Sequence, residues 1–249
     1  MVRPMPAFAP FLAEALGTFA LVFAGPGAIA VDAESGGGVG GVGIGMSFGL
    51  IVMAMIFALG HISGCHINPA VTIAFRALGR MDTPRAAGYI AAQLAGAVLA
   101  GFAIVAIVGD AGDAGASMPR IGGWDAALWS ELILTFFLAF VVFAVATDDR
   151  AEGAFAAIAI GGYVGFAATG WGPVANASMN PARSFGPAVA SNTWDSHWVY
   201  WVGPIAGALI AAAVYEFMRE PQTPGIAATT APLAEDAMID REPVDSRRE

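Results

Sequence analysis

The tripeptide Asn-Pro-Ala occurs twice in this chain, at matching places in the two halves of a very apolar sequence. The copies consist of Asn68, Pro69 and Ala70, and of Asn180, Pro181 and Ala182. Asparagine is a strong N-cap residue and proline fits the first helical position, so each copy predicts the start of a short helix. After its oxygen has capped a helix, an asparagine amide still has N–H groups that can donate to an oxygen of a small neutral molecule.

The composition is typical of a membrane protein. The chain of 249 residues is 57% hydrophobic and 12% charged, whereas a soluble domain carries about 25% charged residues. The net charge of -9 argues against a nucleic-acid partner. The single cysteine, Cys65, excludes an intrachain disulfide and a cysteine-based metal cluster. No metal-ligating cluster and no nucleophile–base pair stands out, so we expect no metal, no cofactor and no enzymatic activity.

Hydropathy predicts six membrane-spanning helices, since a span needs about 20 mostly apolar residues. The six stretches are Pro10–Val31, Gly40–Gly60, Ala86–Val108, Ala126–Thr147, Ala154–Thr169 and Trp198–Met218. Two further stretches, Ile62–Leu78 and Gly170–Ala190, are too short to span, and each contains one Asn-Pro-Ala. We therefore expect an all-α membrane protein with six transmembrane helices and two re-entrant half-helices, in which three spans and one half-helix occur twice.

The arginines predict the orientation, because cytoplasmic loops are enriched in basic residues. With both termini in the cytoplasm, Arg120 is the only loop arginine on the outside. Three spans per half then give the halves opposite orientations, as in an inverted repeat. The expected organisation is a cytoplasmic N-terminus 1–7, a channel domain 8–219 with repeats of about 8–108 and 126–219, and a disordered cytoplasmic tail 220–249. The expected location is the cell (inner) membrane.

Each half also carries a glutamate and a threonine four residues apart on one predicted span. The pairs are Glu14 with Thr18 and Glu131 with Thr135. An ionisable group inside a span is costly and is a functional hypothesis by default. In a structural interpretation, each carboxylate accepts hydrogen bonds from backbone N–H groups of the re-entrant loop in its own half. The alternative interpretation is a proton relay.

The segments that precede the half-helices are candidates for a pore lining. Irregular backbone at membrane depth is tolerated only inside protein or along a water-filled cavity, so Ser63–Ile67 and Ala175–Met179 should border one. Their backbone carbonyls would supply acceptors, notably at Gly64, Cys65, His66, Ala175 and Asn176. The half-helices would meet at mid-membrane with positive dipole ends, which repel cations. Arg183, three residues after Asn180, would add a fixed charge on the extracellular side.

The strings GHISGCHINPAVT and SMNPARSFGPA closely resemble the aquaporin family, the major intrinsic proteins, over about residues 8–219. The resemblance implies a pore in every subunit, a homotetramer in the lipid bilayer, and passive flux of water or small solutes. It also implies a selectivity filter formed by Phe48, Ala168, Ala177 and Arg183. Strict water channels of the family generally have histidine where this chain has Ala168. The filter is therefore wider and is similar to that of nodulin-like plant intrinsic proteins.

The family markers for the permeant disagree with one another. The filter resembles those of relatives that pass glycerol or neutral metalloid acids. Ser184, Ala188 and the pair Tyr200–Trp201 instead resemble the pattern of water channels, here of the bacterial type. The main expectation is a channel that conducts water and excludes protons and ions. The alternatives are a broader channel for small neutral solutes and, because of the two buried glutamates, a proton-coupled transporter.

Cys65 occupies a position that the repeat makes informative. It lies three residues before Asn68, as Ala177 lies three residues before Asn180. The inverted repeat therefore predicts that Cys65 faces the pore on the cytoplasmic side. The alternative is a small buried residue that only fills space.

Overall fold

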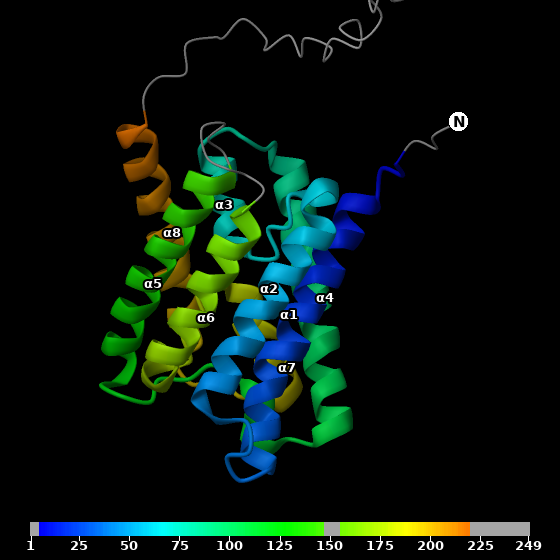
Figure 1. Ribbon diagram of the computed structural model, residues 1–249, viewed down its shortest axis with the longest axis vertical. Helices are drawn as coiled ribbons and strands as arrows, with labels where there is room; N and C mark the ends of the chain where they lie inside the picture. Colours follow the sequence, from blue (N-terminus) through cyan, green and yellow to red (C-terminus); the bar gives the residue numbers. More distant parts are fainter. Residues whose placement is uncertain (1–4, 147–154, 220–249) are drawn as a thin grey trace, which may run out of the picture. The chain divides into compact units, whose positions relative to one another are not determined.

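A computed structural model describes residues 5–146 and 155–219 of the chain, and α-helices dominate this part (Figure 1). The helices are α1 (Ala9–Glu34), α2 (Gly40–Ser63), α3 (Pro69–Ala77), α4 (Thr83–Val108), α5 (Gly123–Ala146), α6 (Ala156–Ala175), α7 (Pro181–Ser191) and α8 (Val199–Met218), with a short 3₁₀ turn η1 (Ala111–Gly115). Six helices have 20 residues or more, whereas α3 has 9 and α7 has 11. The predicted all-α membrane fold with two half-helices is confirmed.

Within the described residues, five helices are both long and apolar enough to cross a bilayer, namely α1, α2, α4, α5 and α8. The remaining long helix, α6, has 20 residues, five of which are glycines. It packs against α2 and α5, and its Gly161 and Gly165 allow a close approach to Gly49 and Gly45 of α2. The chain is thus a multi-pass membrane protein.

Helix α6, which corresponds to the fifth predicted span, extends further at its C-terminal end than the prediction. α6 continues to Ala175, beyond the predicted end at Thr169, although it contains Pro173. A proline in the last turn of a helix removes only one backbone hydrogen bond, so it does not end the helix there. Three predicted features lie outside the described residues. They are the end of the fourth predicted span at Thr147, the start of the fifth at Ala154, and the tail 220–249.

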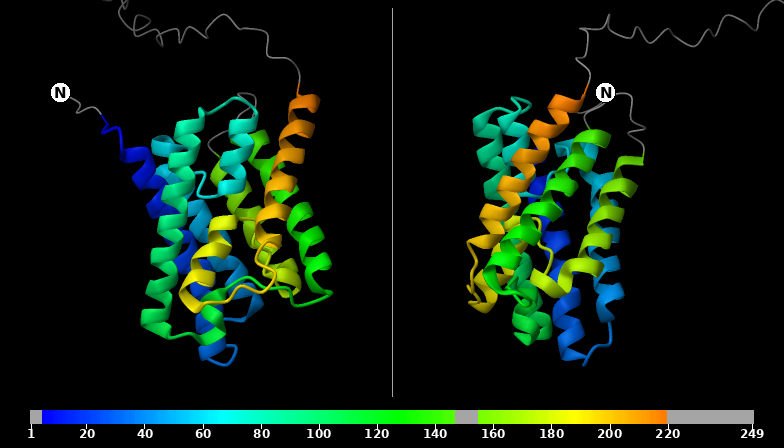
Figure 2. Two further views of the ribbon diagram at one scale, coloured as in Figure 1. Left: turned by 180° about the vertical axis from the view of Figure 1, so that it is seen from behind. Right: turned by 90° about the vertical axis from the view of Figure 1, so that its left-hand side faces the viewer.

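The same helix contacts occur in both halves of the described structure. α1 packs against α2 and α4, and α5 packs in the same way against α6 and α8. Each half-helix also packs against the last long helix of the other half, α3 against α8 and α7 against α4. Figures 1 and 2 show that α3 and α7 extend toward opposite ends of the helix bundle. This arrangement directs the N-termini of the two half-helices toward each other.

Two matched glycines allow the helices of each half to approach closely. A Cβ atom at Gly96 of α4 would collide with the carbonyl oxygen of Ala15 in α1. A Cβ atom at Gly207 of α8 would collide in the same way with the carbonyl oxygen of Leu132 in α5. Small residues permit such backbone contacts between helices in membranes. The first and last long helices of each half are therefore held together by backbone packing at equivalent positions.

Candidate functional site

Each Asn-Pro-Ala motif begins a half-helix, with the asparagine as its N-cap. Asn68 and Asn180 have extended backbone, with φ of -155° and -154°. The Oδ1 atom of Asn68 accepts a hydrogen bond from the Ala70 N–H at 2.9 Å. The Oδ1 atom of Asn180 accepts from the Ala182 N–H at 3.0 Å and from the Arg183 N–H at 3.3 Å. Both half-helices thus begin with a side-chain cap of the kind that asparagine favours.

The two asparagines also join the halves of the molecule to each other. The Asn68 Nδ2 atom donates to the carbonyl of Met179 at 2.8 Å. The Asn180 Nδ2 atom donates to the carbonyl of Ile67 at 2.8 Å. Each amide nitrogen has two N–H groups, so this exchange leaves one on each asparagine. The remaining pair lies where the positive ends of the two half-helices meet.

The extended loops begin one residue later than the sequence predicted. Ser63 and Ala175 are the last residues of α2 and α6, and the next residues, Gly64 and Asn176, have left-handed backbone with φ of 87° and 66°. A left-handed residue after the last helical turn is a common way to end a helix. Ala175 is buried against residues of α5 and α8. The structure thus places Ala175 at the end of α6, one residue before the loop to which the sequence assigned it.

The two loops follow the same backbone path. Cys65 and Ile67 have φ of 49° and 43°, and their counterparts Ala177 and Met179 have φ of 43° and 54°. Left-handed backbone at residues other than glycine costs about 1–2 kcal/mol each. Such strain persists only where the surroundings fix the conformation. The buried glutamates supply that fixation in both halves.

Glu14 binds the first loop with both oxygens of its carboxylate. Oε1 accepts from the Ser63 hydroxyl at 2.7 Å and from the His66 N–H at 2.9 Å. Oε2 accepts from the Ile67 N–H at 2.6 Å and from the Gln93 Nε2 atom at 2.8 Å. The side chain is fully buried. Its four bonds connect α1 to the loop and to α4.

Glu131 does the same for the second loop with fewer partners. Its Oε1 and Oε2 atoms accept from the N–H groups of Ser178 and Met179, both at 2.6 Å. The residue is fully buried. Tyr200 stands on α8 where Tyr89 stands on α4. The Tyr89 hydroxyl donates to the Ser63 carbonyl at 2.8 Å, but the Tyr200 hydroxyl has no hydrogen-bond partner in the part of the chain that the structure describes.

Arg183 is almost completely buried and is only partly satisfied by hydrogen bonds. It is 1% exposed. Its Nη1 atom donates to the Gly115 carbonyl at 3.0 Å and to the Ser117 hydroxyl at 2.6 Å. Nε and Nη2 have no partner within residues 5–146 and 155–219. The guanidinium carbon lies 5.1 Å from the centre of the Phe48 ring. This charged group therefore keeps two unpaired donor atoms, both shielded from solvent, beside an aromatic ring.

Two cavities meet at Phe48, whose ring lines both. The first has a volume of about 110 Å³ and borders both asparagines, the loop residues from Gly64 to Ile67, and Ala177. The second has a volume of about 470 Å³ and borders Ala168 and Asn176, together with Asp32 and Arg120. Three of the four predicted filter positions thus line these cavities, and the fourth, Arg183, lies against Phe48.

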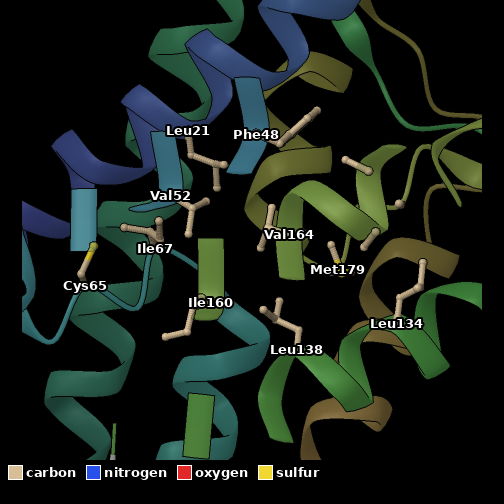
Figure 3. Close-up of a cluster of buried hydrophobic side chains, with 13 residues drawn as sticks. Leu21, Phe48, Val52, Cys65, Ile67, Leu134, Leu138, Ile160, Val164 and Met179 are labelled. Carbon is tan, nitrogen blue, oxygen red and sulfur yellow. The ribbon is translucent and has the colours of Figure 1, made fainter. Parts of the chain in front are cut away.

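The first cavity has one polar side and one apolar side. Loop backbone and the two asparagines form the polar side. Figure 3 shows the apolar cluster at the same place, with Phe48 and Val52 from α2, Leu138 from α5, and Ile160 and Val164 from α6 around a common centre. Cys65 belongs to this cluster and lines the cavity. A molecule in the cavity can hydrogen-bond along one side and contact hydrocarbon along the other.

Sequence reasoning missed the residues that hold Arg183. Gly115 and Ser117 lie in the connection between α4 and α5, which has no counterpart in the repeat and carries no recognisable motif. The same connection is bound to the end of α6, because the N–H groups of Arg120 and Ile121 both donate to the Val174 carbonyl, at 2.9 and 3.1 Å. A buried serine in a loop gives no sequence signal of such a contact.

Comparison with known proteins assigns the family. The family model described as Major intrinsic protein matches residues 1–215. The chain belongs to this family. Three plant proteins of the family are similar over most of their length. Aquaporin NIP1-3 of Oryza sativa subsp. japonica is 44% identical over 213 residues, which cover 86% of this chain and 74% of that protein.

The other relatives and a solved structure agree with this assignment. Aquaporin NIP1-1 of Zea mays is 41% identical, with coverage of 90% of this chain and 79% of that protein. Aquaporin NIP6-1 of Arabidopsis thaliana is 43% identical, with coverage of 84% and 68%. The aquaglyceroporin from Plasmodium falciparum superposes with a TM-score of 0.73 at 26% identity, over 84% of this chain and 96% of that one. The predicted family is confirmed, and the protein is a channel of the major intrinsic protein family.

Proposed function

We propose that this chain is a passive channel for water and for small neutral solutes that carry oxygen, such as glycerol or metalloid acids. The observation that carries the proposal is a pair of buried donors on Arg183, Nε and Nη2, which lie beside the ring of Phe48 and have no partner in the described part of the chain. The other two filter positions are alanines, Ala168 and Ala177, which add neither bulk nor a competing donor. A solute oxygen that enters this space would accept hydrogen bonds from Arg183.

An amphipathic solute suits the pathway better than a purely polar one. Hydroxyl groups would face the loop carbonyls and the free N–H groups of Asn68 and Asn180. Carbon atoms would face Phe48, Val164 and the rest of the apolar cluster. Each polar group then exchanges water for a protein partner, which limits the cost of leaving water. Glycerol has this distribution of polar and apolar surface, and a metalloid acid offers hydroxyl groups to the same donors.

The comparisons favour this broader selectivity over the narrower expectation of a water-only channel. A relative of known structure is named an aquaglyceroporin, and the plant relatives carry the name aquaporin. Ser184, Ala188 and the pair Tyr200–Trp201, which resemble the water-channel pattern, lie outside the four filter positions. We therefore give the filter residues more weight than these markers, and water-only conduction becomes the competing hypothesis.

The hydrogen bonds of the glutamates support a structural role. Both oxygens of Glu14 and of Glu131 accept backbone N–H groups of the loops. If either carboxyl group bound a proton, its new O–H group would face a backbone N–H group. Two donors would then oppose each other, and one of these hydrogen bonds would be lost. We infer that both residues stay in place as loop anchors and that flux needs no proton gradient, in contrast to a proton-coupled transporter.

Assembly and orientation belong to the same proposal. We propose a homotetramer with one pore per subunit, located in the inner membrane of the cell. Both termini would lie in the cytoplasm. Large apolar side chains exposed on the helices, among them Leu12, Met46, Leu99, Ile133 and Phe166, would face lipid or neighbouring subunits. Residues 8–219 would form the channel domain, and the tail 220–249 would lie in the cytoplasm.

Stopped-flow light scattering of proteoliposomes tests the function directly. Vesicles with the protein should shrink faster than empty vesicles under an impermeant osmolyte, and should re-swell faster in a glycerol gradient. Water flux without glycerol entry would support the water-only hypothesis and overturn the broader one. Solute uptake that needs an imposed pH gradient would support a proton-coupled transporter instead.

A further inference from the structure

A row of three buried serines connects Arg183 to the second Asn-Pro-Ala motif. Ser117, Ser184 and Ser178 are each at most 6% exposed, and we call them the serine chain. The Nη1 atom of Arg183 lies 2.6 Å from the Ser117 hydroxyl, which lies 2.8 Å from the Ser184 hydroxyl. The Ser184 and Ser178 hydroxyl oxygens are 2.5 Å apart, and the Ser178 hydroxyl lies 2.9 Å from the Asn180 carbonyl oxygen.

The hydrogen-bond directions at the two ends of the serine chain are clear, because a guanidinium group can only donate and a carbonyl oxygen can only accept. The Ser117 hydroxyl accepts from Arg183 and also from the Ser184 hydroxyl, and the Ser178 hydroxyl donates to the Asn180 carbonyl. Each serine lies within hydrogen-bond distance of two polar partners along the chain. A buried network of this kind restrains its members, so it limits the orientations that Arg183 can adopt.

The equivalent positions of the first half are connected differently. His66 stands where Ser178 stands, and Thr72 stands where Ser184 stands. The Thr72 hydroxyl donates to the Asn68 carbonyl at 3.0 Å and lies 3.1 Å from the His66 Nδ1 atom. It also accepts from the Gln93 Nε2 atom at 3.0 Å, and among the described residues no arginine bonds to this hydroxyl. The serine chain is therefore a feature of the half that carries Arg183, and the repeated fold alone does not require it.

The serine chain determines which nitrogen atom of Arg183 is bound by protein groups. Its Ser117 binds Nη1 from the side of the α4–α5 connection, whereas Nε and Nη2 have no partner within the part of the chain that the structure describes. If the Ser117 hydroxyl were absent, Nη1 would keep only the Gly115 carbonyl, and the guanidinium could rotate about its long side chain. A rotated guanidinium would present different donors and would leave more open space beside Phe48.

We propose that Ser117, Ser184 and Ser178 are positioning residues that set the solute selectivity of the channel by fixing the orientation of Arg183. The proposal rests on the proposed function, in which Arg183 faces the solute. It adds that selectivity depends on residues that no solute touches. It also connects the filter to the motif at mid-membrane, because the serine chain ends on the carbonyl of Asn180.

The test compares the glycerol-to-water and erythritol-to-water permeability ratios of Ser117→Ala with those of the native channel in proteoliposomes. Loss of a hydrogen bond to a charged group should change these ratios roughly three- to tenfold, with the larger solute gaining most. Ser130→Ala is the matched control, because Ser130 is also buried but donates to the Ala127 carbonyl on its own helix, α5, away from the serine chain. Ser184→Thr keeps the hydroxyl and should preserve the ratios that Ser184→Ala alters.

Repeating the test in an Arg183→Val channel distinguishes the positioning role of the serine chain from the proposed function of the filter. In that background Ser117→Ala should have no further effect on the ratios, because the guanidinium that it positions is gone. If Ser117→Ala leaves the ratios unchanged while Arg183→Val alters them, the serine chain has only a structural role and the proposal is overturned. The same follows if Ser117→Ala acts equally in both backgrounds. If Arg183→Val itself leaves the ratios unchanged, the filter assignment fails instead.

Discussion

At the scale of single residues, the predicted filter combines side chains that differ strongly in size and charge. Arg183 is buried with a full charge, and the filter positions around it are an aromatic ring and two alanines. Burying an incompletely paired charge is costly, so its place against Phe48, the residue that borders both cavities, needs a compensating role. Contact with passing solute supplies one, because water or a hydroxyl group can take the hydrogen bonds that the protein leaves open.

Ala168→His should narrow the filter and add a donor opposite Arg183. Ala168 lines the second cavity, which the Phe48 ring separates from the first. We expect glycerol permeability to fall at least tenfold, roughly 1.4 kcal/mol in the barrier, while water permeability stays within about threefold. Stopped-flow light scattering measures both. The control is Ile158→His on the same helix, because Ile158 is 48% exposed and lies outside the lining of both cavities. An unchanged ratio in Ala168→His would remove this residue from the constriction.

Cys65 gives a second test at the residue scale. It is 6% exposed and lines the first cavity beside the loop. A small mercurial that reaches the thiol should obstruct water flux, and Cys65→Ala should conduct normally and be insensitive. Cys65→Ala combined with Ala177→Cys moves the thiol to the matching position at the filter and should restore inhibition. Full flux in the native channel after labelling is verified by mass spectrometry would show that Cys65 only fills space.

At the scale of secondary-structure elements, the loops need support because they are strained and enter the membrane without regular hydrogen bonding. In each half a long helix supplies that support through one glutamate, α1 through Glu14 and α5 through Glu131. Glu14 is the sixth residue of α1 and Glu131 is the ninth residue of α5, and each helix thereby fixes both the depth and the orientation of its loop. The half-helix then starts where the loop ends, with its asparagine already in contact with the other half.

Glu131→Gln should destabilise the second loop without removing any volume. Both carboxylate oxygens accept N–H groups, and the glutamine amide would turn one N–H donor toward another. A buried donor left without an acceptor costs about 1–3 kcal/mol. We expect a lower midpoint of thermal unfolding in detergent, measured by fluorescence-detected size-exclusion chromatography. Glu34→Gln, at the exposed end of α1, should leave the midpoint unchanged, and equal midpoints in all three proteins would contradict the anchoring role.

The elements differ in how far the sequence could predict them. The asparagine caps, the glutamates and the matched glycines Gly96 and Gly207 follow from local chemistry repeated in two halves, and the repeat makes each position informative. The end of α6 could not be predicted in this way, because Pro173 and its neighbouring glycines are typical of a break in a helix. Ser117 could not be predicted either. Its contact with Arg183 depends on how the α4–α5 connection returns to the bundle, and no local pattern encodes that path.

At the scale of the whole molecule, the inverted repeat places two helix N-termini opposite each other in the middle of the membrane. Neither half could do this alone, since Asn68 donates to Met179 and Asn180 donates to Ile67 across the interface between the halves. Each N-terminus carries about half a positive charge, and Arg183 adds a whole one nearby. The resulting positive potential opposes the entry of any cation but has little effect on a neutral molecule.

This potential should make the channel conduct water without conducting protons. Native proteoliposomes that contain a pH-sensitive dye should show fast osmotic shrinkage, but the decay of an imposed pH gradient should match that of empty vesicles. Asn180→Asp keeps the cap acceptor, loses the bond to the Ile67 carbonyl and adds a negative charge at mid-membrane, so proton leak should rise. Asn176→Asp adds the same charge beside the second cavity and keeps the acceptor for the Met118 N–H; its leak should stay close to the native value. A native channel whose proton flux rises in step with its water flux would show that the meeting of the two half-helices does not create the barrier.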